Sequence, residues 1–396
     1  MANIIFILNS PYPYYTGGRE TWIYNVCNRL ADKHNISIIT EKKYYADNRD
    51  GVFEGIHPSI KIYPVFTLKN ISWLRPFIRW YAGFLNNCVS LWLMKRELKK
   101  IIGKNEKIKY YVISMDTLFT GSVAAWSKKQ FDNVLYVSSV RSTHAEISGK
   151  RWPLLKKKLL VMERKNLMQA DDIWANGNDT RDNLKEKGFN SRVVRNGVNI
   201  KQINHPDIGD LHDVIYSKEP KIVTIGTLLD IKGYQELIRA VGLLHKRFKL
   251  KVHLIAIGKG DPQRYGQLAK SEDVVEYVHF LGEQRNAAAY AKNADVIACL
   301  SGGSGLSMAA LESLATKKPV IAWDSPVYRQ MIEHMGNGFL VEEKNVEQLA
   351  RGIAFILQNK DRVQHLGENA YLFARQYDWG YVVKDVETSL LELAGT

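Results

Sequence analysis

The segment KIVTIGTLLDIKGYQELIRAVGLLHKR, residues 221–247, contains one complete repeat of the pattern that decides the fold. Residues 222–225 are a short apolar run that ends at a glycine, which is typical of a buried strand. After a loop, apolar residues recur with the spacing of one helix face, at Leu237, Ile238, Val241 and Leu244. The segment therefore predicts a strand, a glycine turn and a helix in succession.

The same alternation extends in both directions from this segment. An apolar run at 3–8, a turn ending at Gly17-Gly18, a helical pattern and a second apolar run at 35–40 form a βαβ unit. Further strands are expected at 110–114, 134–138, 250–257, 277–281, 296–300 and 319–323. Because βαβ units make parallel sheets with right-handed crossovers, we expect an α/β fold of two facing, doubly wound, Rossmann-like domains.

Length and composition agree with two ordinary globular domains. The chain has 396 residues, 45% of them hydrophobic and 24% charged. Three scattered cysteines suit reduced thiols better than a disulfide or zinc framework, and we expect no metal site. The N-terminal stretch lacks a basic lead and a cleavage site, so it is interpreted as a strand rather than a secretory signal.

The net charge of +14 is concentrated in the first half of the chain. Residues 1–200 carry 32 Lys and Arg against 17 Asp and Glu, whereas the rest of the chain carries 23 against 24. Two segments, 73–104 and 150–165, mix basic residues with Trp, Phe and Leu, and neither has an apolar run long enough to cross a bilayer. They fit either solvated amphipathic helices or a peripheral contact with anionic lipid, and nucleic acid is the weakest alternative.

Ligands of doubly wound sheets bind at the carboxyl ends of the strands, where turns expose backbone N–H groups. The candidate loops are 14–19, 142–146, 226–233, 258–261 and 301–307. Gly17-Gly18 allows a phosphate or sugar to approach the backbone, although a simple tight turn also explains it. Lys232 precedes a helix and can neutralise a phosphate, or it is a solvated loop lysine. His144 can donate a hydrogen bond to a sugar or phosphate, but a lone histidine is more often structural.

The segment SGGSGLSMAALESLA, residues 301–315, contains a single charged residue, Glu312. Its glycine-rich half offers backbone N–H groups, and its second half is an apolar helix. A carboxylate would repel a phosphate bound at this loop, so Glu312 is expected to contact neutral hydroxyls instead. We therefore interpret Glu312 as a two-oxygen acceptor for a ribose diol.

Several of these motifs together carry a family resemblance. They are Gly17-Gly18, RNGVN at 195–199, IGTLLDIKG at 225–233 and SGLSMAALESLATKKPVIA at 304–322. With them the chain resembles the retaining glycosyltransferases of family 4, which belong to the glycosyl transferases group 1 and have the GT-B fold. The resemblance implies an N-terminal acceptor-binding domain at 1–205, a nucleotide-sugar-binding domain at 206–379 and a C-terminal helix, 380–396, that packs back on the first domain.

The resemblance also implies roles for individual residues. His144 and Lys232 take the catalytic roles, with His144 supporting the transferred sugar and Lys232 binding the diphosphate. The residues implied to bind the sugar donor are Gly17, Gly18, Thr227, Lys232, Gly258, Leu281, Ser304, Gly305, Leu306, Ser307 and Glu312. No cofactor or metal is expected, because a retaining transfer needs mainly positioning and stabilisation of the departing diphosphate.

Two positions depart from the family pattern. Ser304 stands where the family has a second glutamate, and Thr227 stands where it usually has an arginine. The resemblance implies a cytoplasmic enzyme that moves a sugar from a nucleotide-sugar to a glycan or lipid-linked acceptor of a cell-surface polysaccharide or glycolipid, and a UDP-sugar is favoured over a GDP-sugar. The basic first half of the chain leads us to expect that the enzyme is peripheral at the inner face of the membrane. A catalytically impaired GT-B binding partner and a nucleotide-sugar epimerase are the alternatives.

Overall fold

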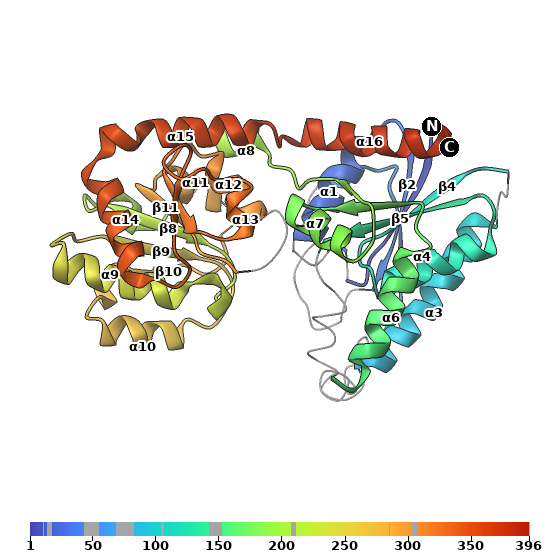
Figure 1. Cartoon of the computed structure of the whole chain (residues 1–396), viewed down its shortest axis with the longest axis horizontal. Helices are drawn as coiled ribbons and strands as arrows, with labels where there is room; N and C mark the ends of the chain where they lie inside the picture. The colour runs from blue at the N-terminus through green and yellow to red at the C-terminus, as the bar shows by residue number, and fades with distance from the viewer. Residues whose placement is uncertain are drawn as a thin grey trace. The chain divides into compact units, whose positions relative to one another are not determined.

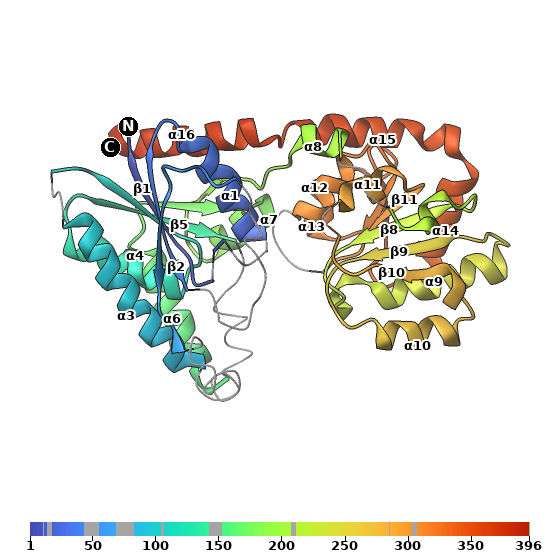
Figure 2. The same ribbon diagram turned by 180° about the vertical axis from the view of Figure 1, so that it is seen from behind.

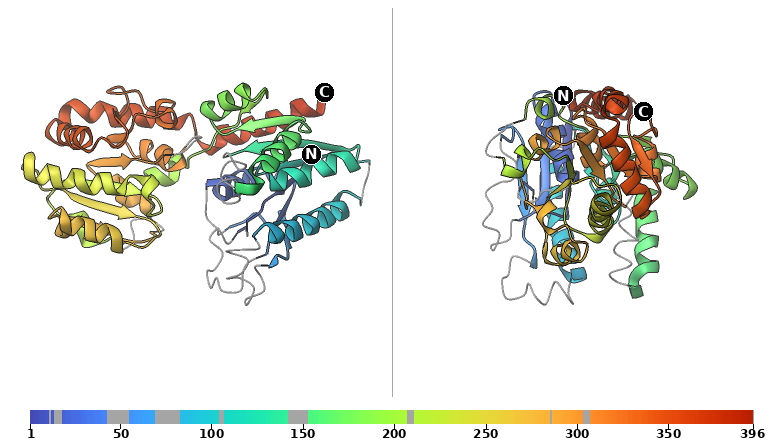
Figure 3. Two further views of the ribbon diagram at one scale, coloured as in Figure 1. Left: turned by 60° about the horizontal axis from the view of Figure 1, so that its bottom comes forward. Right: turned by 90° about the vertical axis from the view of Figure 1, so that its left-hand side faces the viewer.

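A computed structural model of the chain describes residues 1–10, 12–13, 18–42, 55–68, 83–103, 107–141, 153–206, 211–284, 286–302 and 307–395. The chain divides into two compact units (Figure 1). Unit 1 contains residues 1–195 and 382–396, and unit 2 contains residues 196–381. In each unit, taken separately, helices lie on both sides of a parallel sheet (Figure 3).

The described strands of unit 1 form one parallel sheet in the order β3-β2-β1-β4-β5-β6-β7. Their bounds are β1 Asn3–Ile7, β2 Asn35–Glu41, β3 Lys61–Val65, β4 Tyr110–Ser114, β5 Val134–Val140, β6 Asp172–Ala175 and β7 Arg192–Val193. The α-helices are α1 Gly18–Leu30, α3 Gly83–Ile102, α4 Phe119–Gln130, α6 Lys156–Leu167 and α7 Asn178–Glu186, with a 3₁₀ turn at Pro153–Leu155. Helix α4 packs against α3, α6 and β5 (Figure 2).

The described strands of unit 2 form a second parallel sheet, in the order β10-β9-β8-β11-β12-β13. Their bounds are β8 Lys221–Ile225, β9 His253–Ile257, β10 Val278–Phe280, β11 Val296–Cys299, β12 Val320–Trp323 and β13 Phe339–Val341. The α-helices are α8 Ile200–Asn204, α9 Tyr234–Arg247, α10 Gln263–Ser271, α11 Ala287–Lys292, α12 Met308–Leu314, α13 Pro326–Arg329, α14 Val346–Gln358 and α15 Lys360–Arg375. Helix α16, Trp379–Gly395, begins in this unit and belongs to unit 1 from Val382. Short 3₁₀ turns lie at Asp213–Tyr216, Asp230–Lys232 and Val275–Tyr277.

Both sheets reverse their strand order at one point, between β1 and β4 in unit 1 and between β8 and β11 in unit 2. This order is that of a Rossmann sheet, whose ligands bind outside the carboxyl ends of the strands at the reversal. The two doubly wound α/β sheets expected from the sequence are therefore confirmed. Strands β3, β6 and β7 were not expected because each is short and contains a charged residue, and β13 was not expected because its apolar run has only three residues.

The boundary between the units differs from the expected one. From the sequence, the first domain is expected to end at residue 205 and the second to begin at residue 206. The units instead divide between Arg195 and Asn196. The physical reason is that the backbone N–H of Val198 donates to Tyr377 O at 2.8 Å, and that Val198 and Ile203 are buried in the core of unit 2.

The C-terminal helix α16 joins unit 1 from Val382 onward. Trp174 Nε1 donates to Ser389 Oγ at 2.9 Å, and Lys33 Nζ pairs with Glu387 Oε2 at 3.0 Å. These contacts hold the last turns of the chain to the strands and helices of unit 1.

Candidate functional site

The carboxyl edge of the unit 2 sheet brings together most of the described residues that the sequence singled out. Lys232 follows β8, Gly258 follows β9, Leu281 follows β10, and Ser307 and Glu312 follow β11. Gly17, His144, Ser304, Gly305 and Leu306 lie outside the described residues. Gly18 is the first residue of α1 in unit 1.

Lys232 bridges the two loops that flank the reversal point. It ends a 3₁₀ turn after β8, and its Nζ donates a hydrogen bond to Ser301 Oγ, just after β11, at 3.0 Å. Burial lowers the pKa of Lys232. A cation held at this point by a neutral hydroxyl is placed to compensate an anion, because the hydroxyl contributes no negative charge.

Two close backbone approaches shape this edge. A Cβ atom on Gly258, whose φ is +154°, would stand 1.9 Å from Gly226 O, so the loops after β8 and β9 touch only because Gly258 is glycine. A Cβ on Gly233, whose φ is +71°, would stand 2.5 Å from Leu300 Cβ. Glycine at these positions lets three loops meet above the strand ends.

Two buried tyrosines fix the same loops, and neither was predicted from the sequence. Tyr234 Oη donates to Gly226 O at 2.5 Å, and Ser301 N–H donates to Tyr328 Oη at 2.9 Å. Burial raises the pKa of both phenols, so they remain neutral. A tyrosine inside an apolar helical pattern is usually core, and only the loop contacts distinguish these two.

Glu312 lies on α12 and is only partly exposed. It has no hydrogen-bond or ion-pair partner among the residues that the structure describes. Burial raises the pKa of its carboxyl to about 7. A partly buried acid that is this poorly compensated is typical of a residue whose partner is a ligand.

The remaining candidates have weaker individual roles. Ser307 caps α12, because its Oγ accepts a hydrogen bond from Ala310 N–H at 3.3 Å. Leu281 is partly buried, and its N–H donates to Ala256 O at 3.0 Å. Thr227 is exposed in the loop after β8, where it supplies no fixed positive charge.

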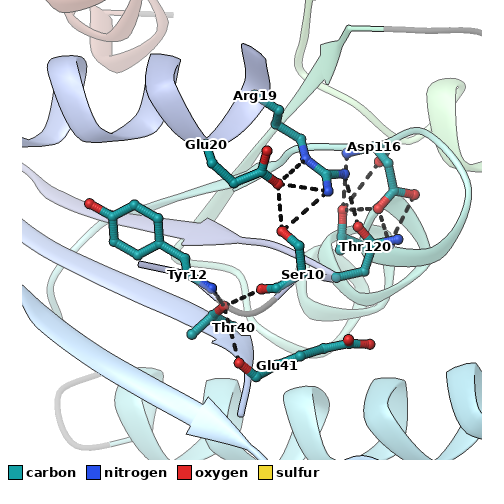
Figure 4. Close-up of polar contacts among 9 residues, drawn as sticks. Ser10, Tyr12, Arg19, Glu20, Thr40, Glu41, Asp116 and Thr120 are labelled. Carbon is teal, nitrogen blue, oxygen red and sulfur yellow. Dashed lines mark hydrogen bonds and ion pairs between the residues drawn. The ribbon is translucent and has the colours of Figure 1, made fainter. Parts of the chain in front are cut away.

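Unit 1 has its own polar cluster around the start of α1, shown in Figure 4. Ser10 Oγ donates to Glu20 Oε1 at 2.6 Å, and Glu20 is 2% exposed. Arg19 donates to Asn9 Oδ1 at 2.9 Å and to Glu20 Oε1 at 3.0 Å. The cluster ties the end of β1 to the beginning of α1 on both sides of Gly17-Gly18, and the sequence analysis did not identify it.

A second part of this cluster follows β4. The buried carboxylate of Asp116 accepts hydrogen bonds from the N–H groups of Leu118 and Phe119 at 2.9 and 2.6 Å. It also accepts one from Thr120 Oγ1 at 2.7 Å (Figure 4). Asp116 therefore stabilises the beginning of α4. Because these hydrogen bonds already occupy its carboxylate, Asp116 has a structural role.

The end of β5 leads into the segment that contains His144. Arg141, the first residue after β5, stacks its guanidinium 4.1 Å from the centroid of the Trp22 ring. Its Nε donates to Ser139 Oγ at 3.0 Å, and burial lowers its pKa to about 9. The carboxyl edge of unit 1 thus carries a partly buried cation at the end of β5, which is the neighbour of β4.

Comparison with known proteins agrees with this geometry. Residues 212–373 match the family model described as Glycosyl transferases group 1. An uncharacterized glycosyltransferase of Haemophilus influenzae is 25% identical over 41% of this chain and 47% of its own length. One from Methanocaldococcus jannaschii is 23% identical over 96% of both chains, and an O-antigen biosynthesis glycosyltransferase of Escherichia coli is 24% identical over 86% of both.

Solved structures share the fold over the whole chain. Sucrose-phosphate synthase from Thermosynechococcus elongatus superposes with a TM-score of 0.78 at 18% identity and covers 100% of both chains. The Anabaena protein HepE in complex with UDP superposes with a TM-score of 0.76 at 17% identity, over 98% of this chain and 100% of its own. The fold is that of the GT-B glycosyltransferases, and the resemblance to the glycosyl transferases group 1 is confirmed.

Proposed function

We propose that the protein is a retaining glycosyltransferase of family 4 that moves a sugar from a nucleotide-sugar to a hydroxyl of a glycan or lipid-linked acceptor. The observation that carries the proposal is the arrangement at the reversal point of unit 2. There, a partly buried lysine is held between two loops, and a poorly compensated carboxylate follows on the next helix. This combination suits a ligand with a diphosphate and a ribose diol.

Each half of that ligand has its partner. Lys232 compensates the diphosphate, and Glu312 accepts hydrogen bonds from the ribose hydroxyls. UDP is the favoured nucleotide over GDP, because a protein of the same fold is known in complexes with UDP and with UDP-glucose. His144 is proposed to support the sugar during transfer.

The transfer is proposed to follow a front-face course. The acceptor hydroxyl attacks from the side on which the diphosphate leaves, the C–O bond to the diphosphate breaks, and a β-phosphate oxygen takes the hydroxyl proton. Lys232 stabilises the charge that develops on the diphosphate, and no divalent metal is required. Ser304 and Thr227 supply neither the carboxylate nor the fixed cation that the family usually has there, so Lys232 has a larger share of this stabilisation.

The acceptor is proposed to be part of a cell-surface polysaccharide or glycolipid. One relative takes part in O-antigen biosynthesis, and another is a phosphatidyl-myo-inositol mannosyltransferase of Mycobacterium leprae. Among the described residues, no helix has both the length and the apolar character needed to span a bilayer. We propose instead that the basic part of unit 1 rests on the inner face of the membrane.

Helices α3 and α6 supply the surface for that contact. Lys156, Lys157 and Lys158 are exposed at the start of α6, next to Leu154, which is 99% exposed. On α3, Trp92 is 62% exposed. Exposed lysines beside exposed apolar side chains fit an anionic lipid surface better than they fit water alone.

The proposal is tested by incubating the protein with UDP-glucose, UDP-galactose or GDP-mannose and a glycan or lipid-linked acceptor, and measuring nucleotide release. We expect release from a UDP-sugar by the wild type and its loss in Glu312→Ala. Proton NMR of the product then reports the anomer, and an inverted linkage would contradict the retaining course.

The two alternatives give different results in the same assay. A GT-B partner that has lost turnover, which Ser304 and Thr227 together favour, binds UDP without releasing it from any UDP-sugar. An epimerase converts the free UDP-sugar into its epimer with no acceptor present. Binding and product analysis therefore separate the three functions.

A further inference from the structure

The opposite edge of the unit 2 sheet, at the amino ends of β11 and β12, contains a cavity that the proposed function does not use. The cavity has a volume of about 310 Å³. Asp295 and Pro319, which precede the two strands, line it together with the start of α15. Its size is at the lower end of small-molecule sites, roughly 300–1,000 Å³.

Three lysines and three acids line this cavity, and two further lysines lie close to it. Lys317, Lys318 and Lys360 line it, and Lys221 and Lys292 lie near enough to act electrostatically on Lys318. The only carboxylate that acts on Lys318 is that of Asp295, among the charged groups whose influence on its pKa is resolved. Three lysines and one carboxylate therefore act on the charge of Lys318.

Most of these charges already have partners. Asp295 Oδ1 pairs with Lys360 Nζ at 2.9 Å, and Asp295 Oδ2 accepts from the backbone N–H of Lys221 at 2.9 Å. Lys292 Nζ donates to a backbone carbonyl at 2.8 Å. Lys317 Nζ pairs with Glu368 Oε2 at 3.1 Å. Both oxygens of Asp295 are thus in use.

Lys318 is the exception. Its side chain is partly buried, and within the described ranges its ammonium has no hydrogen-bond or ion-pair partner. Burial lowers the pKa of Lys318, and the neighbouring Lys292, Lys360 and Lys221 lower it further against the opposing effect of Asp295. Asp361, also on the cavity wall, is exposed to solvent. The cavity thus presents a partly buried ammonium whose one resolved opposing charge, that of Asp295, is already paired with Lys360.

We propose that this cavity is a second binding site, for a small anion that carries a phosphate group. Lys318 binds the phosphate directly, and Lys360 adds a second contact from the rim while it remains paired with Asp295. The site lies at the far end of β11 from Ser301, so it is separate from the nucleotide loops. The inference does not depend on the proposed function.

The test uses inorganic phosphate as the probe, with isothermal titration calorimetry on the full chain. We expect binding of one phosphate per chain in the Lys232→Met variant, which removes the cation of the nucleotide loops. In that background, Lys318→Met should weaken phosphate binding about tenfold, because a charge-assisted contact is lost. Lys270→Met, which removes an exposed lysine of the same unit, is the matched control and should leave the affinity unchanged.

A third variant gives an effect of the opposite sign. Asp295→Asn keeps an oxygen for the N–H of Lys221 but removes the charge that competes with the anion, so phosphate should bind about tenfold more tightly. Thermal melting of each variant shows that it is folded before it is titrated. The inference is overturned if phosphate does not bind at millimolar concentration, or if it binds with the same affinity in Lys318→Met and Asp295→Asn.

Discussion

Lys232 and Ser301 join the two strands that flank the reversal point of unit 2, through a hydrogen bond of 3.0 Å from Nζ to Oγ. They are 69 residues apart in the sequence, and they meet because β8 and β11 are neighbours in the sheet. The bond holds a cation where a doubly wound sheet binds its ligand. The proposed sugar-donor site is built around it.

The packing of the loops after β8 and β9 depends on Gly258. We expect Gly258→Ala to lower the free energy of unfolding of unit 2 by roughly 3 kcal/mol or more, because the new Cβ would meet Gly226 O at 1.9 Å and φ is +154°. Urea unfolding measures the change. Gly266→Ala is the control, since Gly266 lies in α10 with no atom within 4 Å of its Cβ position, and this variant should be stabilised by roughly 0.5–1 kcal/mol. Equal effects in the two variants would show that the close approach is not there.

Glu312 should make nucleotide binding depend on pH. Its carboxyl has a pKa of about 7, raised by burial, so it is largely protonated at pH 6 and ionised at pH 8. The ionised form is the better acceptor for ribose hydroxyls, and we expect the affinity for UDP to rise between pH 6 and pH 8. Glu312→Gln should lose this rise and bind less tightly at pH 8. The phosphate groups of UDP ionise identically in both experiments, so only the difference in affinity between the wild type and Glu312→Gln reports on Glu312. If the affinities of the two proteins change with pH in parallel, Glu312 does not bind the ribose.

The ionisation of Glu312 also affects the stability of the fold. Ionisation favours nucleotide binding but lowers stability. The pKa of Glu312 in the folded protein is above its ordinary value of 4.5 in the unfolded chain. Its contribution is therefore fully present below pH 4.5 and is lost as the pH rises through 7. We expect Glu312→Gln to melt at a higher temperature than the wild type at pH 8, and at nearly the same temperature at pH 4.5. Melting curves without nucleotide at the two pH values check this, and a destabilised variant at pH 8 would contradict it.

The fold could be predicted from the sequence to the level of its repeating units. Apolar runs that end at glycine, followed by a 3.6-residue period, located most of the central strands of both sheets. Short strands such as Arg192–Val193 could not be predicted, because they have too few residues for a pattern and form only through their neighbours. The start of unit 2 was placed late, since Val198 is held by contacts with Tyr377 that are distant in sequence.

The candidate site was predicted unevenly for a similar reason. Lys232 and Glu312 carry chemistry at motif positions, so the sequence pointed to them directly. Tyr234 and Tyr328 act through hydrogen bonds to loop backbone, and a sequence does not show which hydroxyl reaches which carbonyl or N–H. Glu20 was missed because its partners, Ser10 and Arg19, converge only after α1 folds against β1.

The basic surface of unit 1 should bind anionic membranes. We expect reversal of Lys156, Lys157 and Lys158 to glutamate to weaken binding to phosphatidylserine vesicles at least 100-fold, at about 1 kcal/mol for each lysine removed and more for each charge reversed. Binding by the wild type should also weaken as salt is raised. Reversal of Lys246, Lys251 and Lys270 in unit 2 is the matched control. If vesicle binding changes neither with salt nor on charge reversal of Lys156, Lys157 and Lys158, α6 does not contact the membrane.

The cluster in unit 1 should stabilise the glycine turn before α1. Glu20→Ala removes the acceptor of Ser10 Oγ and Arg19, and leaves a largely buried guanidinium uncompensated. We expect the free energy of unfolding to fall by roughly 3 kcal/mol. Chemical unfolding measures it, with Glu97→Ala as a control, because Glu97 pairs with the exposed Lys100 on α3 and its loss should cost at most about 1 kcal/mol. A cost for Glu20→Ala no larger than the control would contradict the structural role.

The central claim is that Lys232 binds the diphosphate of a nucleotide-sugar, and calorimetric titration of UDP tests it most directly. The wild type should bind one UDP, and Lys232→Met should bind it at least tenfold more weakly, while Lys270→Met binds like the wild type. Titration of uridine, which lacks the diphosphate, should show no difference between wild type and Lys232→Met. If UDP does not bind to the wild type, or binds equally to Lys232→Met, the proposed sugar-donor site is wrong.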